Sequence, residues 1–413
     1  MAAIQNVISF FTSQNLGSRI SWLAAVLWCF ALPFAQIQHT RFTSIFLFSI
    51  LGGFLISILR NGFSIYKVPF RNFKQCLPFI FLAILPLIHG FDSEANAKEI
   101  VLRAPLFIIP FVLLYQAVSW HSRTKVILMV TFLLSYCICN AVLFSWGIEE
   151  VYCFVRSELE TGPLFLISRP YFGICAGIVF FGISGLLFPD SKSIGLDFGL
   201  FLPVAALLFI ILAKISLIAF CISFAVYLFL KYRKRPVFLL SFVFISGLIL
   251  AVGTFKVVQS SAFKDAVTLG GINYSSLPKV YSNSINNRLI LWRASFQLLK
   301  EGSHGLTGYS PEELQTALDK KVSQYNGYLT NWHLNPHNQL LYMVLKYGLF
   351  GLAVFIFLWS SLLFGNKPIW TGAWFFIFIC SFTEVYLDRE MGVQLFILTF
   401  FLSRNTNKTG YFG

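Results

Sequence analysis

Charged residues are scarce in this sequence, and their scarcity excludes an ordinary soluble fold. Only 12% of the 413 residues are Asp, Glu, Lys or Arg, whereas 57% are hydrophobic and 48 residues are Phe. Soluble domains carry roughly 25% charged residues. Because a chain with so few polar groups cannot cover a globular surface with them, we expect an integral membrane protein.

Several signatures of other protein classes are also missing. The sequence has no nucleotide-binding loop, and the long segment before the last apolar runs has no acidic pair of the DxD kind. Residues 1–19 lack the basic start of a cleavable signal peptide. The eight cysteines show neither metal-ligand spacing nor a paired extracellular set. We therefore expect no cofactor and no metal. The cysteines inside apolar runs are predicted to pack in the core: Cys29, Cys137, Cys139, Cys175, Cys221 and Cys380.

Long apolar runs, in contrast, are abundant. A helix needs roughly 20 residues to cross about 30 Å of hydrocarbon. Runs of about this length lie near 20–37, 43–59, 76–90, 101–119, 126–146, 170–188, 196–212, 215–230, 237–254, 349–364, 370–386 and 391–403. They are continuously apolar, whereas the strands of a barrel would alternate. The sequence thus predicts an all-α polytopic membrane protein with about twelve transmembrane helices.

The distribution of charge predicts which side of the membrane each break faces. The net charge of +14 comes from basic residues in a few short breaks: Arg60, Lys67, Arg71 and Lys74; Arg123 and Lys125; Lys231, Arg233, Lys234 and Arg235; and Arg404 and Lys408. With twelve spans, all of these breaks fall on the side of the N-terminus, which the positive-inside rule makes cytoplasmic. Acidic breaks at Asp92, Glu94 and Glu99 and at Glu149, Glu150, Glu158 and Glu160 fall outside. We expect both termini in the cytoplasm and no nucleic-acid partner.

One connection is much longer than the others and divides the chain into three parts. Residues 1–254 hold the first nine predicted spans, residues 255–348 form a large outer loop with short helices, and residues 349–413 hold the last three spans and a cytoplasmic tail. A loop of this length is usually functional or disordered. Its many Trp and Tyr residues favour an ordered, functional loop.

Two helices are predicted within this loop. The stretch "NNRLILWRASFQLLKEG" has apolar residues at helical spacing, which places Arg288 in the first turn and Trp292 one turn later. In "GLTGYSPEELQTALDKK", Ser310 is a good N-cap, Pro311 suits the first helical position, and Glu313 follows three residues after the cap. This pattern predicts a capping box.

The stretch "NPHNQLLYMVLKYGLFG" predicts a third helix with a histidine at its start. Asn335 would be the N-cap and Pro336 the first helical residue, so His337 would lie in the first turn. Residues 337–347 have one apolar face and predict an interfacial helix. Gly348 and Gly351 would let the chain bend before the next span.

The chemistry of this histidine leaves several interpretations open. The positive end of a helix disfavours an imidazolium, so His337 would be a neutral base, and the free N–H groups there would suit a phosphate. Alternatively, His337 anchors a helix at the height of the headgroups. His333 could be the reactive residue instead, or the two histidines could form part of a metal site.

Cations near the outer face support a binding site for an anion. Arg169 precedes the sixth run, Lys214 lies in a tight outer break, and Arg103 lies inside the fourth run. Charges at membrane depth are costly and often functional. Snorkelling to headgroup phosphates explains Arg103 best. Together, Arg169, Lys214 and Arg288 would suit a lipid diphosphate.

These motifs resemble those of the O-antigen ligase and polymerase superfamily of membrane glycosyltransferases. Arg288, Trp292, Gly305 and Gly308 are similar to one family pattern, and His337, Asn338, Leu341, Gly348 and Gly351 are similar to the pattern HN..L…GL.G. The stretch "TEVYLDREMG", with Glu384 and Asp388, resembles an acidic stretch before the family's last span. Where the family has Ser-Arg between the seventh and eighth spans, this chain has Ala213-Lys214.

The resemblance implies a reaction and a set of site residues. His337 would be the general base; Arg288, Arg169 and Lys214 would hold a diphosphate; and Asn338, Trp292 and Asp388 would support the site. The enzyme would transfer a glycan from undecaprenyl diphosphate to a hydroxyl of lipid A-core at the periplasmic face of the bacterial inner membrane, with inversion and without a metal. We expect a monomer whose partners are this donor, this acceptor and membrane lipids.

Other functions remain open from the sequence. A polymerase of the Wzy type would use the same donor and loop, and a protein glycan ligase would use a Ser or Tyr acceptor. A twelve-span transporter or flippase would normally show two similar halves with its site near the membrane midplane. The gathering of charges at one face disfavours transport.

Overall fold

A computed structural model describes most of the chain. It covers residues 16–36, 43–61, 70–90, 94–117, 120, 124–146, 169–189, 193–210, 213–234, 284–301, 305–325, 330, 334–364 and 366–404. Within these ranges every regular element is a helix, which agrees with the predicted all-α fold.

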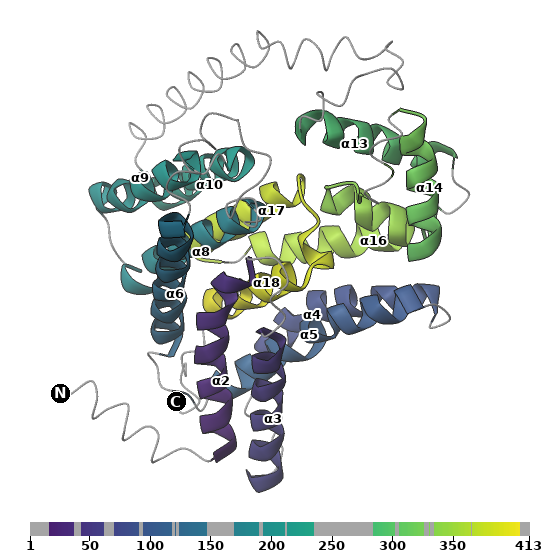
Figure 1. Ribbon diagram of the computed structural model, residues 1–413. Helices are drawn as coiled ribbons and strands as arrows, with labels where there is room; N and C mark the ends of the chain where they lie inside the picture. The colour runs from purple at the N-terminus through teal and green to yellow at the C-terminus, as the bar shows by residue number, and fades with distance from the viewer. Residues whose placement is uncertain are drawn as a thin grey trace, which may run out of the picture.

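The helices follow the predicted apolar runs (Figure 1). The first part of the chain forms α2 (Leu16–Ala31), η1 (Leu32–Gln36), α3 (Thr43–Asn61), α4 (Phe70–Ile84), η3 (Leu85–His89), α5 (Glu94–Ala117), α6 (Thr124–Trp146), α8 (Arg169–Leu187), α9 (Ile194–Ile210) and α10 (Lys214–Tyr232). The second part forms α13 (Ser284–Glu301), α14 (Pro311–Ser323), α16 (Gln339–Leu363), α17 (Pro368–Ser381), η7 (Tyr386–Asp388) and α18 (Glu390–Ser403).

Six described helices are long and apolar enough to cross a membrane, and several shorter apolar helices accompany them. The chain is thus a multi-pass membrane protein. The predicted run 237–254 lies outside the described residues, so the count of twelve spans stays a prediction. The predicted run 370–386 is too long at its end, because α17 stops at Ser381 and a non-helical segment follows.

The helix α18 is the centre of the molecule. Its side chains are buried from Met391 to Ser403, and Figure 1 shows it surrounded by other helices. Outer helices instead expose apolar side chains: Phe48 and Leu59 of α3 are 72% and 85% exposed, as expected of helices that face lipid. Cys137 and Cys221 are also exposed, so the prediction that they pack in the core is wrong.

Contacts at one end of the bundle join the predicted outer breaks. At this end, which we call the site end, Arg103 of α5 contacts Asp388 of η7. The ring of Tyr171, near the start of α8, packs edge-on against Tyr386, with 5.5 Å between the ring centroids. These three elements therefore meet where the predicted topology places the outer face.

Contacts at the opposite end join the predicted inner breaks. The indole Nε1 of Trp22, on α2, donates to the hydroxyl of Thr124 at 3.3 Å. The Nζ of Lys125, at the start of α6, lies 3.5 Å from the carbonyl oxygen of Leu402 near the end of α18. Both sets of contacts are consistent with the predicted alternation of helix directions. We call this opposite end of the bundle the tail end.

The helices α13 and α14 pack beside the first half of α16 and share a small core with it (Figure 1). Ile290, Leu291, Leu314, Leu318 and Leu345 are buried there. The predicted capping box of α14 is confirmed: Ser310 and Glu313 each accept a hydrogen bond from the other's backbone N–H.

Candidate functional site

The start of α16 differs from the prediction. Asn338 is the N-cap, because its Oδ1 accepts a hydrogen bond from the N–H of Leu341 at 3.0 Å. The Oδ1 of Asn335 accepts from the N–H of His337 at 2.9 Å, two residues away, which forms a turn rather than a helix start. The predictions that Asn335 caps the helix and that His337 lies in its first turn are therefore wrong.

His337 has a strained backbone instead of a helical one. Its φ is 47°, and among the described residues it is the only non-glycine residue with a positive φ. This left-handed conformation costs roughly 1–2 kcal/mol for a residue with a Cβ. Such strain often occurs at functional sites, where surrounding contacts hold it in place.

The imidazole of His337 faces the carboxylate of Glu384. The Nδ1 atom lies 3.3 Å from both oxygens of Glu384, and the two side chains are 22% and 9% exposed. Because a carboxylate only accepts hydrogen bonds, Nδ1 carries the hydrogen and the lone pair of the neutral ring lies on Nε2. His337 is thus arranged as a base that a carboxylate holds in one tautomer.

Glu384 is well suited to remain ionised in this position. Burial acts to raise its pKa, but the hydrogen bond from His337, the backbone N–H of Val385 and the charge of Arg288 together hold the pKa below its usual value. Glu384 lies in the acidic stretch that resembles the family's, but no role was predicted for it from the sequence. Only the tertiary contact identifies it as the partner of His337.

Two side chains of α13 reach the segments on either side of this pair. The Nε of Arg288 donates to the carbonyl oxygen of Thr383 at 3.2 Å, directly beside Glu384. The Nε1 of Trp292 donates to the carbonyl oxygen of Pro336 at 2.9 Å, directly before His337. The predicted spacing of one turn between Arg288 and Trp292 thus lets one helix hold both segments.

Arg169 and Lys214 are the first residues of α8 and α10. Their side chains lie outside the part that the structure describes, but their helices begin near the site. Gly173, one turn into α8, lies against Ser216 near the start of α10. The structure therefore brings the backbone of both predicted anion ligands to the site end.

Motif glycines join the long loop to a kink in α16. Gly348 has a φ of 57° and a ψ of −140°, which interrupts the helix and confirms the predicted bend. A Cβ at this position would lie 2.5 Å from the backbone of Leu306. The N–H of Leu349, which the kink frees, donates to the carbonyl oxygen of Gly305 at 3.0 Å. A Cβ at Gly308 of the loop, whose φ is 72°, would likewise lie 2.4 Å from the backbone of Lys346, so the close backbone contact explains the glycines at 308 and 348.

The carbonyl groups that the kink frees also find partners. The carbonyl oxygen of Leu345 accepts from the N–H of Tyr309 at 2.8 Å. The carbonyl oxygen of Lys346 lies 2.6 Å from Nε2 of His89, at the end of η3. Because buried backbone groups need partners, these bonds fix the direction of the first half of α16, which follows His337.

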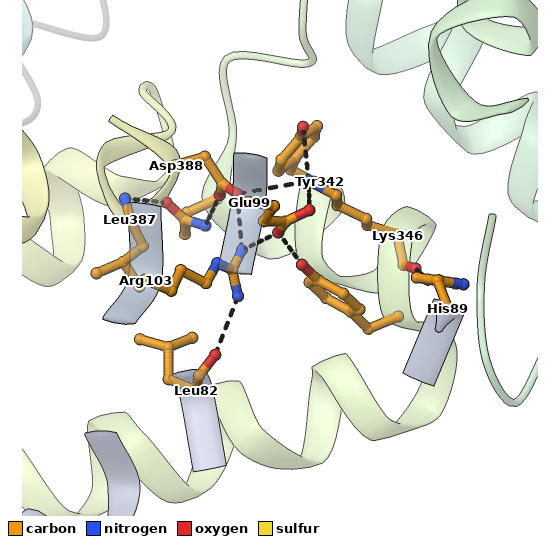
Figure 2. A network of polar contacts seen from close by, with 10 residues as sticks. Leu82, His89, Glu99, Arg103, Tyr342, Lys346, Leu387 and Asp388 are labelled. Atoms are coloured by element: carbon orange, nitrogen blue, oxygen red, sulfur yellow. Dashed lines mark hydrogen bonds and ion pairs between the residues drawn. The ribbon is translucent and has the colours of Figure 1, made fainter. Parts of the chain in front are cut away.

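A buried network of charges lies beneath the site (Figure 2). Arg103 is fully buried, and its Nη2 contacts Asp388 at 2.7 Å and Glu99 at 2.9 Å. Lys346 forms an ion pair with Glu99 and lies 3.7 Å from Asp388. The two cations and two carboxylates compensate each other, as buried charges require. The prediction that Arg103 snorkels to headgroups is wrong, because its guanidinium has protein partners.

Asp388 belongs to this network and not to the immediate surroundings of His337. Burial acts to raise its pKa, but the charges of Arg103 and Lys346 and the hydrogen bonds from Arg103 and Gln339 hold the pKa below its usual value. Gln339, Lys346 and Glu99 were not predicted from the sequence to belong to the site. One signal was available: the opposite charges Glu99 and Arg103, four residues apart in a helix, indicated an ion pair rather than an isolated cation.

Metal binding by the two neighbouring histidines is not tested by the structure. His333 lies outside the described ranges, and within those ranges no three His, Cys, Asp or Glu side chains form a group that could hold a metal ion.

Residues 198–356 match a family model described as O-antigen ligase. This range includes Lys214, Arg288, Trp292, His337 and Asn338, and it confirms the predicted resemblance to the O-antigen ligase and polymerase superfamily. A search of curated proteins gave no significant match to the chain.

Proposed function

We propose that this membrane protein of the O-antigen ligase superfamily transfers a glycan from undecaprenyl diphosphate to a hydroxyl of lipid A-core at the periplasmic face of the inner membrane. The observation that carries this proposal is the pairing of His337 with Glu384 beside Arg288. A base in a fixed tautomer next to a cation suits an acceptor hydroxyl and an anionic leaving group.

In the proposed reaction, Nε2 of His337 removes the proton from the acceptor hydroxyl. The oxygen attacks the anomeric carbon of the donor from the face opposite the diphosphate, so the configuration is inverted. The bond between the anomeric carbon and the phosphate oxygen breaks, and its electron pair leaves with the diphosphate. Glu384 stabilises the imidazolium until its proton passes to water. No step requires a metal.

Arg288 is the proposed ligand of the diphosphate with the best support. Its Nε is anchored to the carbonyl oxygen of Thr383, so the position of its guanidinium is restricted. A guanidinium can bind phosphate oxygens in a bidentate manner. Arg169 and Lys214 are proposed as further ligands because their helices begin at the same end, although the Lys side chain lacks bidentate geometry.

The remaining predicted residues have supporting roles in this proposal. Asn338 caps α16 and Trp292 holds the carbonyl of Pro336, so both act on the segment that carries His337. The loop of residues 255–348 would hold the reacting groups at the height of the headgroups, where both lipid-linked substrates can reach them.

A polymerase of the Wzy type remains the second candidate, because the same site could add the glycan to another lipid-linked glycan. A protein glycan ligase and a transporter remain alternatives that no described contact favours. The charges that gather at the site end suit chemistry at one face better than passage through the midplane.

Deletion of the gene distinguishes the ligase from the polymerase. For a ligase, the deletion strain should accumulate long polymer on undecaprenyl diphosphate and bare lipid A-core, because transfer is the missing step. The two lipid pools are extracted and compared by gel electrophoresis and mass spectrometry. Lipid A-core that carries a single repeat unit would overturn the ligase assignment and support a polymerase, and the intact gene supplied on a plasmid is the control.

A further inference from the structure

The side-chain amide of Gln339 joins the two segments that carry His337 and Glu384. Its Nε2 donates to Oδ2 of Asp388 at 3.0 Å, and its Oε1 accepts from the backbone N–H of Leu387 at 2.8 Å. Gln339 is fully buried and is the first residue of α16. Both polar ends of one side chain thus hold the neighbouring segment, and we call this pair of bonds the amide clamp.

The amide clamp lies close to the proposed base along both segments. Gln339 lies two residues after His337, and Leu387 and Asp388 lie three and four residues after Glu384. The structure shows no other side-chain hydrogen bond between residues 334–339 and 383–388 besides the His337–Glu384 contact itself, among those it describes. The clamp is therefore the direct side-chain link between these two described segments, which α13 otherwise holds separately through Arg288 and Trp292.

The partner of the clamp is itself immobile. Asp388 is held by Arg103, whose Nη1 also donates to the carbonyl oxygen of Leu82 at 3.2 Å (Figure 2). The helices α4 and α5 thereby provide a fixed point behind η7. Arg103 fixes the position of Asp388 on η7, and Gln339 links Asp388 to the start of α16.

The His337–Glu384 contact needs such support. Both of its N···O distances are 3.3 Å, longer than the usual 2.7–3.2 Å of a strong hydrogen bond. The backbone of His337 is also strained. A weak contact on a strained residue does not by itself hold an imidazole in one orientation.

We propose that Gln339, held by Asp388, is a positioning residue that sets the orientation of His337 against Glu384. This inference rests on the proposed role of His337 as the base. An amide is required at position 339 because one end must donate to a carboxylate and the other must accept from an N–H. A carboxylate in its place would repel Asp388.

An exchange of donor and acceptor tests the amide clamp. Gln339→Glu places a second carboxylate next to Asp388. Asp388→Asn sets two amide side chains against each other, and the donor of Gln339 then loses the carboxylate oxygen that accepted its hydrogen bond. In the double variant Gln339→Glu/Asp388→Asn, the amide at position 388 can donate to the carboxylate at position 339, which can still accept from Leu387. The number of buried carboxylates is then the same as in the natural protein.

Glycan transfer is measured in detergent with undecaprenyl-diphosphate-linked glycan and lipid A-core purified from the strain that carries the gene. Misplacement of a catalytic group by about 1 Å can cost up to 10²-fold in rate. We expect each single variant to lose about 10- to 10²-fold in kcat with little change in the KM for the donor, and the double variant to recover most of this loss. Gln315→Glu is the matched control, since Gln315 makes the same kind of bond to a carboxylate, donating to Asp319 at 3.0 Å within α14.

A second measurement does not depend on turnover. In protein labelled with ¹⁵N-histidine, the signals of His337, assigned by their absence in His337→Ala, report which ring nitrogen carries the hydrogen. Gln339→Glu should give a mixture of tautomers, and the double variant should restore the natural spectrum. If Gln339→Glu cannot be purified, Gln339→Met removes both bonds without adding charge and should show the same change.

The outcomes separate the two proposals. An inactive natural protein would contradict the proposed function, and the spectrum of His337 would still decide the inference. Full activity and an unchanged spectrum in Gln339→Glu, or a double variant as impaired as the two single changes combined, would overturn the role of the amide clamp.

Discussion

At the scale of single residues, the meaning of each charge depends on its partner. Arg103 and Arg288 are both cations near the predicted outer face, but Arg103 is fully buried between two carboxylates and Arg288 lies beside the His337–Glu384 pair. The first is part of the buried framework and the second is a candidate ligand. Sequence position alone does not separate these roles.

We expect His337, which faces Glu384, and not His333, to be required for glycan transfer. His337→Ala should lose roughly 10²- to 10⁴-fold in the rate of glycan transfer, because the general base is removed, while binding of the donor persists. His333→Ala, four residues earlier, is the matched control and should stay near the natural rate. Initial rates of transfer and binding of the radiolabelled donor are measured for both proteins. A normal rate in well-expressed His337→Ala protein would rule out the base.

At the scale of elements, the local sequence predicts where helices form, but it does not always predict the residue at which a helix begins. The capping box of α14 and the bend at Gly348 were both predicted, because Ser310, Glu313 and Gly348 act through their own neighbours. The start of α16 was predicted three residues too early. Asn335 and Asn338 are equally good caps by residue type, and contacts with η7 and α13 decide between them.

The kink of α16 should not tolerate a side chain. Gly348→Ala places a Cβ on a residue with positive φ and against the backbone of Leu306, so it should destabilise the protein by about 1–3 kcal/mol and lower activity. Gly199→Ala on α9 is the control, because nothing lies within 4 Å of its added Cβ. It should be neutral or stabilising by roughly 0.5–1 kcal/mol.

Thermal unfolding in detergent and transfer assays compare the two glycine variants. Equal unfolding midpoints for Gly348→Ala and Gly199→Ala would show that the backbone junction between residues 305–309 and the kink does not fix α16.

At the scale of the whole molecule, the contacts divide between two ends of one bundle. The proposed site, the buried charge network and the starts of α8 and α10 lie at the site end, whereas Trp22, Thr124 and Lys125 meet at the tail end. Enzyme chemistry with two lipid-linked substrates requires that the whole site faces one side of the membrane. The charge distribution predicts that this side is the periplasm.

Labelling of single introduced cysteines tests this orientation. Lys98 has a side chain 74% exposed near the start of α5 at the site end, and Arg233 is exposed just beyond α10 at the opposite side of the predicted topology. In intact spheroplasts, a membrane-impermeant maleimide should label Lys98→Cys, and it should label Arg233→Cys only after lysis. The natural protein gives the background from its own cysteines. The reverse pattern would place the site in the cytoplasm and contradict the proposed acceptor.

The sequence by itself determined that this is a helical membrane protein, where most of its helices lie and which motifs resemble a glycosyltransferase superfamily. Those properties follow from composition and from spacing along a few turns of chain. Only the tertiary structure decided that Glu384 is the partner of His337, because the two residues are 47 positions apart. The same holds for the amide clamp and for the burial of Arg103. Each depends on which helices pack together, and the energy of a buried charge or hydrogen bond is set by partners that local sequence does not specify.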